Sequence, residues 1–130
     1  MPRILVIDDE PGIRGLLAAI LERKGYQVLL AENGRKGLAL FRRERPDVVV
    51  LDLKMPEMDG RTVLKALHTL HPGLPVVILT GIGTEETEQQ VRALGAVACI
   101  GKEFSLHRLG DTLKHLLPLP AHPPEASRFP

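Results

Sequence analysis

The sequence predicts an α/β fold in which five short strands alternate with five helices. Short apolar runs rich in valine, isoleucine and leucine recur along the chain, and they do not alternate with polar residues. Continuous runs of this kind are typical of strands covered on both faces, as in a parallel sheet. Between the runs, apolar residues recur every three or four positions, which is typical of helices with one buried face. Strands that alternate with helices indicate βαβ units, with right-handed crossovers and helices on both faces of the sheet.

Five apolar runs are the expected strands, and four of them are strong. Each strong run has four consecutive apolar residues, whereas the second run along the chain is shorter. The expected strands are Ile4–Ile7, Val28–Leu30, Val48–Leu51, Val76–Leu79 and Val97–Ile100.

The first two expected helices have clear boundary signals. The first has Pro11 in its first turn and Gly25 as a candidate terminator. One apolar stripe runs along it, formed by Ile13, Leu16, Leu17, Ile20 and Leu21. In the second helix, Asn33 is a candidate N-cap, and Leu38 and Phe41 are expected to face inward.

The last three expected helices differ in the apolar surface that they offer. The third covers about Arg61–Leu70 and presents Leu64, Leu67 and Leu70. The fourth begins after Thr84, a candidate cap, and its acidic first turn complements the helix dipole. Its apolar stripe is mainly Val91 and Leu94, so we expect weak docking and mobility. The fifth has Ser105 as its expected cap, and its inward residues are Leu106, Leu109, Leu113, Leu116 and Leu117.

Size and charge narrow the classes of function. The 130 residues make about one domain, and 17 basic residues nearly balance 16 acidic residues, for a net charge of +1. That balance, with 3% aromatic residues and no tryptophan, gives little reason to expect direct nucleic-acid binding. The single cysteine, Cys99, excludes an intramolecular disulfide and a cysteine-rich zinc site.

The two ends of the chain give expectations about compartment and domain boundaries. No apolar run approaches the roughly 20 residues of a membrane span, and a strand-like run begins directly after Met1-Pro2-Arg3. We therefore expect no membrane association, no signal peptide and a cytoplasmic location. Recurrent prolines from Pro118 onward indicate a domain over residues 1–117 and a flexible tail or truncated linker over 118–130.

Polar residues suited to chemistry follow four of the expected strands. In an open α/β sheet, ligands bind outside the carboxyl ends of the strands. The residues at those ends are Asp8, Asp9, Glu10, Asp52, Thr80 and Lys102. Three aspartates are therefore expected to converge on one edge of the sheet, opposite a hydroxyl and an ammonium group.

Clustered aspartates predict a divalent cation and phosphoryl chemistry. Two carboxylates about 4–5 Å apart repel by roughly 3–4 kcal/mol at an effective dielectric of about 20, and a cation between them relieves this. Oxygen ligands without a nearby histidine or cysteine favour Mg²⁺, which keeps several waters and can grip phosphoryl oxygens. The hydroxyl of Thr80 and the ammonium of Lys102 are suited to neutralise a phosphoryl group. Asp52, on a central strand, is the candidate nucleophile for an aspartyl-phosphate.

Each of these residues also has a purely structural interpretation. An aspartate after a strand is commonly a turn former or a helix cap, so Asp8 or Asp9 could merely cap the first helix. Lys102 could be a solvated surface lysine. The joint presence of the aspartates, Thr80 and Lys102 at four strand ends favours one functional site over these separate explanations.

Several blocks of the sequence resemble the receiver domain of two-component response regulators. The resemblance covers roughly residues 2–117, and its blocks are Ile4–Glu10, Asp52–Gly60, Leu79–Gly81 and Gly101–Phe104. It implies a flavodoxin-like, doubly wound sheet of five parallel strands in the order 2-1-3-4-5, with five helices.

The resemblance also implies a chemical role for the acidic residues. Asp52 is implied to accept a phosphoryl group from a phosphohistidine of a sensor histidine kinase or phosphotransfer protein. The implied Mg²⁺ ligands are Asp8, Asp9, Asp52 and the backbone carbonyl of Lys54. Beyond its own phosphorylation and dephosphorylation, such a domain is not expected to be an enzyme.

By the same resemblance, Lys102 pairs with the phosphoryl group, and the hydroxyl of Thr80 moves to hydrogen-bond one of its oxygens. The residues implied to shape the loops of the site are Met55, Pro56, Gly60 and Gly81. Phosphorylation is implied to switch partner binding through the face made by the fourth helix, fifth strand and fifth helix. That face is also a possible homodimer contact.

Two positions depart from the family pattern. Cys99 stands where an aromatic residue usually couples to the threonine, so that coupling cannot operate, and we expect a buried core thiol. Glu103 stands where a proline usually follows the lysine through a cis peptide bond. The Lys102–Glu103 bond is therefore either trans or strained, and Glu103 could compete for the ammonium of Lys102. We expect phosphorylation to survive and the output to be altered or weakened.

Two other functions are alternatives to a phosphorylated receiver. A receiver-like docking module that is not phosphorylated is favoured by Cys99 and Glu103 but opposed by the intact acceptor residues. A phosphohydrolase with an aspartate nucleophile needs a second aspartate two residues later, where this chain has Lys54. The receiver can stand alone or be part of a longer regulator.

Overall fold

Five strands and five helices alternate along the chain in the computed structural model, which describes residues 2–81, 84–102 and 105–117. The strands are β1 (Arg3–Ile7), β2 (Gln27–Ala31), β3 (Val48–Leu51), β4 (Val76–Thr80) and β5 (Ala98–Gly101). The helices are α1 (Pro11–Arg23), α2 (Gly34–Glu44), α3 (Gly60–Leu70), α4 (Glu85–Ala93) and α5 (Ser105–Leu116). The expected α/β class is confirmed.

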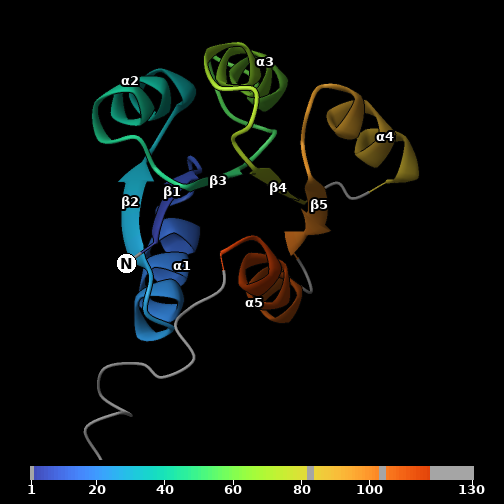
Figure 1. The fold of residues 1–130 in the computed structure, drawn as a ribbon. Helices are drawn as coiled ribbons and strands as arrows, with labels where there is room; N and C mark the ends of the chain where they lie inside the picture. The colour runs from blue at the N-terminus through green and yellow to red at the C-terminus, as the bar shows by residue number, and fades with distance from the viewer. Residues whose placement is uncertain (1, 82–83, 103–104, 118–130) are drawn as a thin grey trace, which may run out of the picture.

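The strands form one parallel sheet in the order β2-β1-β3-β4-β5, which confirms the flavodoxin-like topology. Figure 1 shows α1 and α5 on one face of the sheet and α2, α3 and α4 on the other. Ile7, the last residue of β1, pairs with Ala31 of β2 and Leu51 of β3. This register brings the residues that follow β1 and β3 to the same edge of the sheet.

Alternate residues of the central strands enter two separate cores. On the side of α2, α3 and α4, the sheet contributes Leu5, Ile7, Val49, Leu51, Val76 and Ile78. On the side of α1 and α5, it contributes Ile4, Val6, Val48, Val50, Val77 and Leu79. All of these side chains are buried, because helices cover both faces, and this explains why the strands do not alternate with polar residues.

The boundary signals read from the sequence are present for the first, second and fourth helices. The side chain of Asn33 accepts a hydrogen bond from the backbone N–H of Lys36 at 2.8 Å, and Thr84 accepts one from Thr87 at 3.1 Å. Pro11 is the first residue of α1, and Gly25 follows that helix with φ +99°, a conformation that favours glycine.

Four apolar residues that were expected inside lie on the surface. Leu16, Leu70, Val97 and Leu106 are exposed. In α1 only Leu17 and Leu21 are buried, because a helix against a sheet buries a narrower arc than the apolar stripe of this sequence covers. Leu70 is the last residue of α3, and Val97 precedes β5. Ser105 was expected to cap α5 but is the first residue of that helix.

Helix α4 makes the thin apolar contact with the sheet that its sequence predicts. It buries only Thr87 and Val91, and Leu94 is partly buried against the core. The expected mobility of α4 stays a prediction. No helix in the described part of the chain is long and apolar enough to cross a membrane. The expected tail over 118–130 and Glu103 lie outside the described residues.

Candidate functional site

The backbone holds two of the predicted aspartates at the carboxyl edge of the sheet. Asp8 directly follows β1, and its N–H donates to the carbonyl of Ala31 at 3.1 Å. Asp52 directly follows β3, and its N–H donates to the carbonyl of Ile7 at 3.0 Å. These two bonds extend the sheet by one residue, so both carboxylates are fixed by the fold. Asp8 is 1% exposed and Asp52 is 3% exposed.

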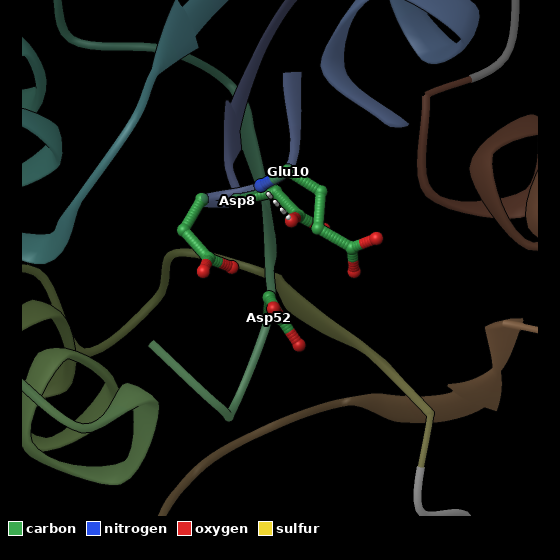
Figure 2. A group of neighbouring side chains, drawn as sticks. Asp8, Glu10 and Asp52 are labelled. Atoms are coloured by element: carbon green, nitrogen blue, oxygen red, sulfur yellow. Dashed lines mark hydrogen bonds between the residues drawn. The ribbon is translucent and has the colours of Figure 1, made fainter. Parts of the chain in front are cut away.

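Asp8 also shapes the chain that leads into α1. Its carboxylate accepts a hydrogen bond from the N–H of Glu10 at 2.9 Å, shown as a dashed line in Figure 2. The guanidinium of Arg14 donates to the Asp8 carbonyl at 2.6 Å. The structural interpretation of Asp8 as a turn former is therefore correct, and it coexists with a place in the acidic cluster.

Four carboxylates gather at this edge. One carboxylate oxygen from each lies within 4.8 Å of the others, and the four residues are Asp8, Asp9, Glu10 and Asp52. Asp8, Glu10 and Asp52 of this group are labelled in Figure 2. The donor set is made of oxygen, carries several negative charges and lies beside solvent at Glu10 and the half-buried Asp9. This chemistry fits a hard divalent cation such as Mg²⁺.

Lys102 brings the opposing positive charge from the other end of the chain. Its ammonium lies 2.7 Å from the carboxylate of Glu10, 3.1 Å from that of Asp8 and 3.4 Å from that of Asp52. The Lys102 side chain is 15% exposed, so it is not the solvated surface lysine of the alternative interpretation. The sequence places Glu10 at this edge without assigning it a role. Its third place in a run of three acidic residues after β1 was the available signal.

Burial and mutual repulsion shift the pKa values of the buried carboxyls upward. Burial, then the charge of Asp8, raises the pKa of Asp52 to about 6, against the pull of Lys102. Burial also raises the pKa of Asp8, although the hydrogen bond from Glu10 and the contact with Lys102 lower it in part. Burial lowers the pKa of Lys102, but Glu10, Asp52 and Asp8 together outweigh it, so the pKa lies above its usual range.

The loop between β3 and α3 wraps closely around Asp52. A Cβ added at Gly60 would lie 2.3 Å from the carbonyl oxygen of Asp52, so a side chain there would push the loop away. Met55 is partly buried against the core, whereas Lys54 and Pro56 are exposed. Glu57 has φ +70°, which marks a tight turn. At Gly81, by contrast, an added Cβ would meet no atom within 4 Å.

Thr80 and Cys99 lie on neighbouring strands. Thr80 ends β4 and is 1% exposed. Cys99 pairs with Ile78 across β4 and β5, is free and buried, and belongs to the core beneath α4. Burial raises the pKa of its thiol, which disfavours the reactive thiolate. The expectation of a buried core thiol is confirmed, whereas the Lys102–Glu103 peptide lies outside the described residues.

Comparison with known proteins finds one family. The profile described as response regulator receiver domain matches residues 4–114. Sporulation initiation phosphotransferase F of Bacillus subtilis is 38% identical over 117 residues, which are 90% of this chain and 94% of that protein. Regulatory protein AtoC of Escherichia coli is 36% identical over 117 residues, but these cover only 25% of that protein. This chain therefore spans nearly all of one relative and a quarter of the other.

Solved structures give the same likeness. Chemotaxis protein CheY4 of Vibrio cholerae has a TM-score of 0.85 and 33% identity, covering 90% of this chain and 99% of that one. Response regulator TrrA of Thermotoga maritima, solved in complex with Mg(2+)-BeF, has a TM-score of 0.82 and 33% identity. That likeness covers 90% of this chain and 100% of that one.

Proposed function

This chain belongs to the response regulator receiver domain family, and from that premise we propose that it accepts a phosphoryl group on Asp52 from a sensor histidine kinase or phosphotransfer protein. The observation that carries the proposal is the place of Asp52: a buried carboxylate at the end of β3, between a second buried carboxylate and the ammonium of Lys102.

In the proposed transfer, a carboxylate oxygen of Asp52 attacks the phosphorus of a phosphohistidine. A P–O bond forms as the P–N bond breaks, and the electron pair of that bond stays on the imidazole nitrogen of the donor. The product is an acyl phosphate on Asp52. Because the pKa of Asp52 is about 6, its carboxyl is mostly ionised at neutral pH, which is the form that attacks.

We infer that Mg²⁺ is held by Asp8, Asp9, Asp52 and the backbone carbonyl of Lys54. The support is the oxygen-rich donor set, with its carboxylate oxygens within 4.8 Å of one another. Bound there, Mg²⁺ would offset the negative charge of the phosphoryl oxygens. The similar TrrA was solved in complex with Mg(2+)-BeF, which is in line with this assignment.

Lys102 and Thr80 are the proposed contacts of the bound phosphoryl group. Lys102 already lies 3.4 Å from Asp52, and Thr80 ends the adjacent strand. Movement of Thr80 is proposed to act on the face formed by α4, β5 and α5, which would switch partner binding. Cys99, which is small and buried, stands on this face in place of the aromatic residue whose movement is usually coupled to that of the threonine. We therefore propose that the effect of phosphorylation on partner binding is altered or weakened.

The proposed setting is a cytoplasmic phosphorelay, with residues 1–117 as the receiver and 118–130 as a tail or linker. AtoC, of which the chain covers a quarter, is named as a regulatory protein, so a receiver of this kind can be one part of a longer regulator. The face formed by α4, β5 and α5 is the proposed site for a partner or a second copy, without direct nucleic-acid binding by this segment.

A docking module that is never phosphorylated is the second candidate. It is favoured by Cys99 at the switch position and by the three carboxylates that already engage Lys102. In that case the fold would serve as a binding platform, and Asp52 would keep its carboxylate unmodified.

Incubation with Mg²⁺ and acetyl phosphate, followed by intact mass measurement, separates the two candidates. We expect a mass gain of one phosphoryl group that requires Mg²⁺ and disappears in Asp52→Asn. Asp111→Asn is the matched control, because Asp111 is exposed on α5 and should leave the gain intact. No gain in the parent protein would favour the docking module, and a gain that survives Asp52→Asn would show that another residue accepts the phosphoryl group and would exclude Asp52 as the acceptor.

A further inference from the structure

Within the described part of the chain, the shortest ion pair of the Lys102 ammonium is with a residue to which the proposed transfer gives no role. Glu10 lies 2.7 Å from it, closer than Asp8 at 3.1 Å or Asp52 at 3.4 Å. An ammonium group has three N–H donors and no acceptor, so each of these carboxylates can accept from it. Glu10 and Lys102 are 92 positions apart in the chain, so only the fold brings them together.

The three contacts differ in their exposure to water. The side chains of Asp8 and Asp52 are 2% and 4% exposed, whereas that of Glu10 is 57% exposed. Glu10 is the N-cap residue of α1, yet its side chain makes no capping hydrogen bond to that helix. Its backbone is fixed instead by the hydrogen bond to Asp8, which leaves the carboxylate directed to Lys102.

A phosphoryl group on Asp52 would need one of the three ammonium donors of Lys102. The carboxylate of Asp8 is buried, so water cannot take the place of its contact with Lys102. Releasing Glu10 costs little, because its exposed carboxylate is solvated by water at once. Esterification removes the negative charge of the Asp52 carboxylate, so the phosphoryl oxygens take over its contact with Lys102, and Glu10 is the exposed carboxylate that competes with them for the ammonium.

We propose that Glu10 is a positioning residue that holds Lys102 at the rim of the site and competes with the phosphoryl group for its ammonium. This inference rests on the proposed function. It assigns to Glu10 control over how readily the phosphorylated form is stabilised. Removing its charge should free Lys102 for the phosphoryl group and favour the phosphorylated form.

The test uses beryllofluoride as a phosphoryl mimic at saturating Mg²⁺, with binding followed by amide chemical shifts. We expect Glu10→Gln to bind beryllofluoride about two- to fivefold more tightly than the parent, the range set by one partly exposed ion pair. Glu10→Asp keeps the charge but shortens the reach, and it should fall between the two. Glu32→Gln is the control: it removes a charge that pairs with Lys36 and should change the affinity less than about twofold.

A second measurement needs neither metal nor mimic. In the metal-free protein, nitrogen relaxation of the Lys102 ammonium should show greater mobility in Glu10→Gln than in Glu32→Gln. Unchanged Lys102 mobility, or unchanged or weaker beryllofluoride binding in Glu10→Gln, overturns the role of Glu10 and leaves the proposed function standing. Failure of the parent protein to bind beryllofluoride with Mg²⁺ overturns the proposed function, and the role of Glu10 with it.

Discussion

The ionised carboxylate of Asp52 lowers the free energy of unfolding, because it lies buried at this edge of the sheet. It is buried beside Asp8, and its pKa is raised from 3.8 to about 6. A carboxyl whose pKa is higher in the folded protein than in the unfolded chain destabilises the fold when it is ionised. That cost is present above about pH 6, shrinks as the pH falls towards about 4, and is absent below both pKa values.

Replacing Asp52 by asparagine should therefore stabilise the metal-free protein. We expect the free energy of unfolding of Asp52→Asn to exceed that of the parent by about 1–3 kcal/mol at about pH 8, with the gain lost as the pH falls from about 6 to about 4. Urea unfolding across this pH range, without divalent cations, measures it. Asp111→Asn removes an exposed carboxylate and should change stability by less than about 0.5 kcal/mol. A gain that is larger in acid than at the alkaline end of the range would contradict the assignment of the cost to the ionised form.

Helix α4 has little contact with the core, so its stability depends strongly on its ends. The helix buries only Thr87 and Val91. The hydroxyl of Thr84 holds its first turn: it accepts a hydrogen bond from the N–H of Thr87 and lies 2.9 Å from the Thr87 hydroxyl. Hydrogen bonds also join α4 to α3, because the guanidinium of Arg61 in α3 donates to the side-chain oxygen of Gln90 in α4. An element held in this way should open more readily than the rest of the fold.

Loss of the cap should loosen α4 before it loosens the sheet. We expect Thr84→Ala to lower the free energy of unfolding by about 1 kcal/mol and to speed hydrogen exchange of the α4 amides, because the N–H of Thr87 loses its hydrogen-bond acceptor. Thr84→Ser keeps the accepting hydroxyl and should retain most of the protection. Native-state hydrogen exchange by mass spectrometry resolves the two cases. Equal acceleration in α4 and in β1 would show instead that α4 opens only with the whole molecule.

The molecule as a whole is held by two cores, one on each face of the sheet (Figure 1). The neighbours Leu16 and Leu17 of α1 show how sharply that arrangement divides residues. Leu17 is 1% exposed and packs against the sheet, whereas Leu16 is 46% exposed. The same side chain therefore contributes very differently at two adjacent positions.

Alanine at these two positions tests the docking of α1. We expect Leu17→Ala to lower the free energy of unfolding by about 2–5 kcal/mol, because it removes buried apolar contact and leaves a cavity. Leu16→Ala, in the same helix, should change it by less than about 0.5 kcal/mol. Urea unfolding monitored by circular dichroism gives both values. Similar losses at the two positions would mean that both leucines of the stripe are buried.

Much of the fold could be predicted because its signals are local. The strand at Val48–Leu51, the cap at Asn33 and the turn at Gly25 depend on neighbouring residues, and all were found where expected. The convergence of Asp8 and Asp52 was also predictable, since parallel strands end at a common edge. The exposure of individual residues within an apolar stripe was not predictable, because it depends on which side of a helix meets the sheet.

The chain by itself determined the alternation of strands and helices, the family likeness and the set of polar groups at the strand ends, because periodicity, capping and motif are written in consecutive residues. Only the tertiary structure decided that Leu16 and Leu106 face solvent and that Lys102 pairs with Glu10. These are relations between segments remote in sequence, and they follow from how helices dock and strands align, which no local pattern specifies.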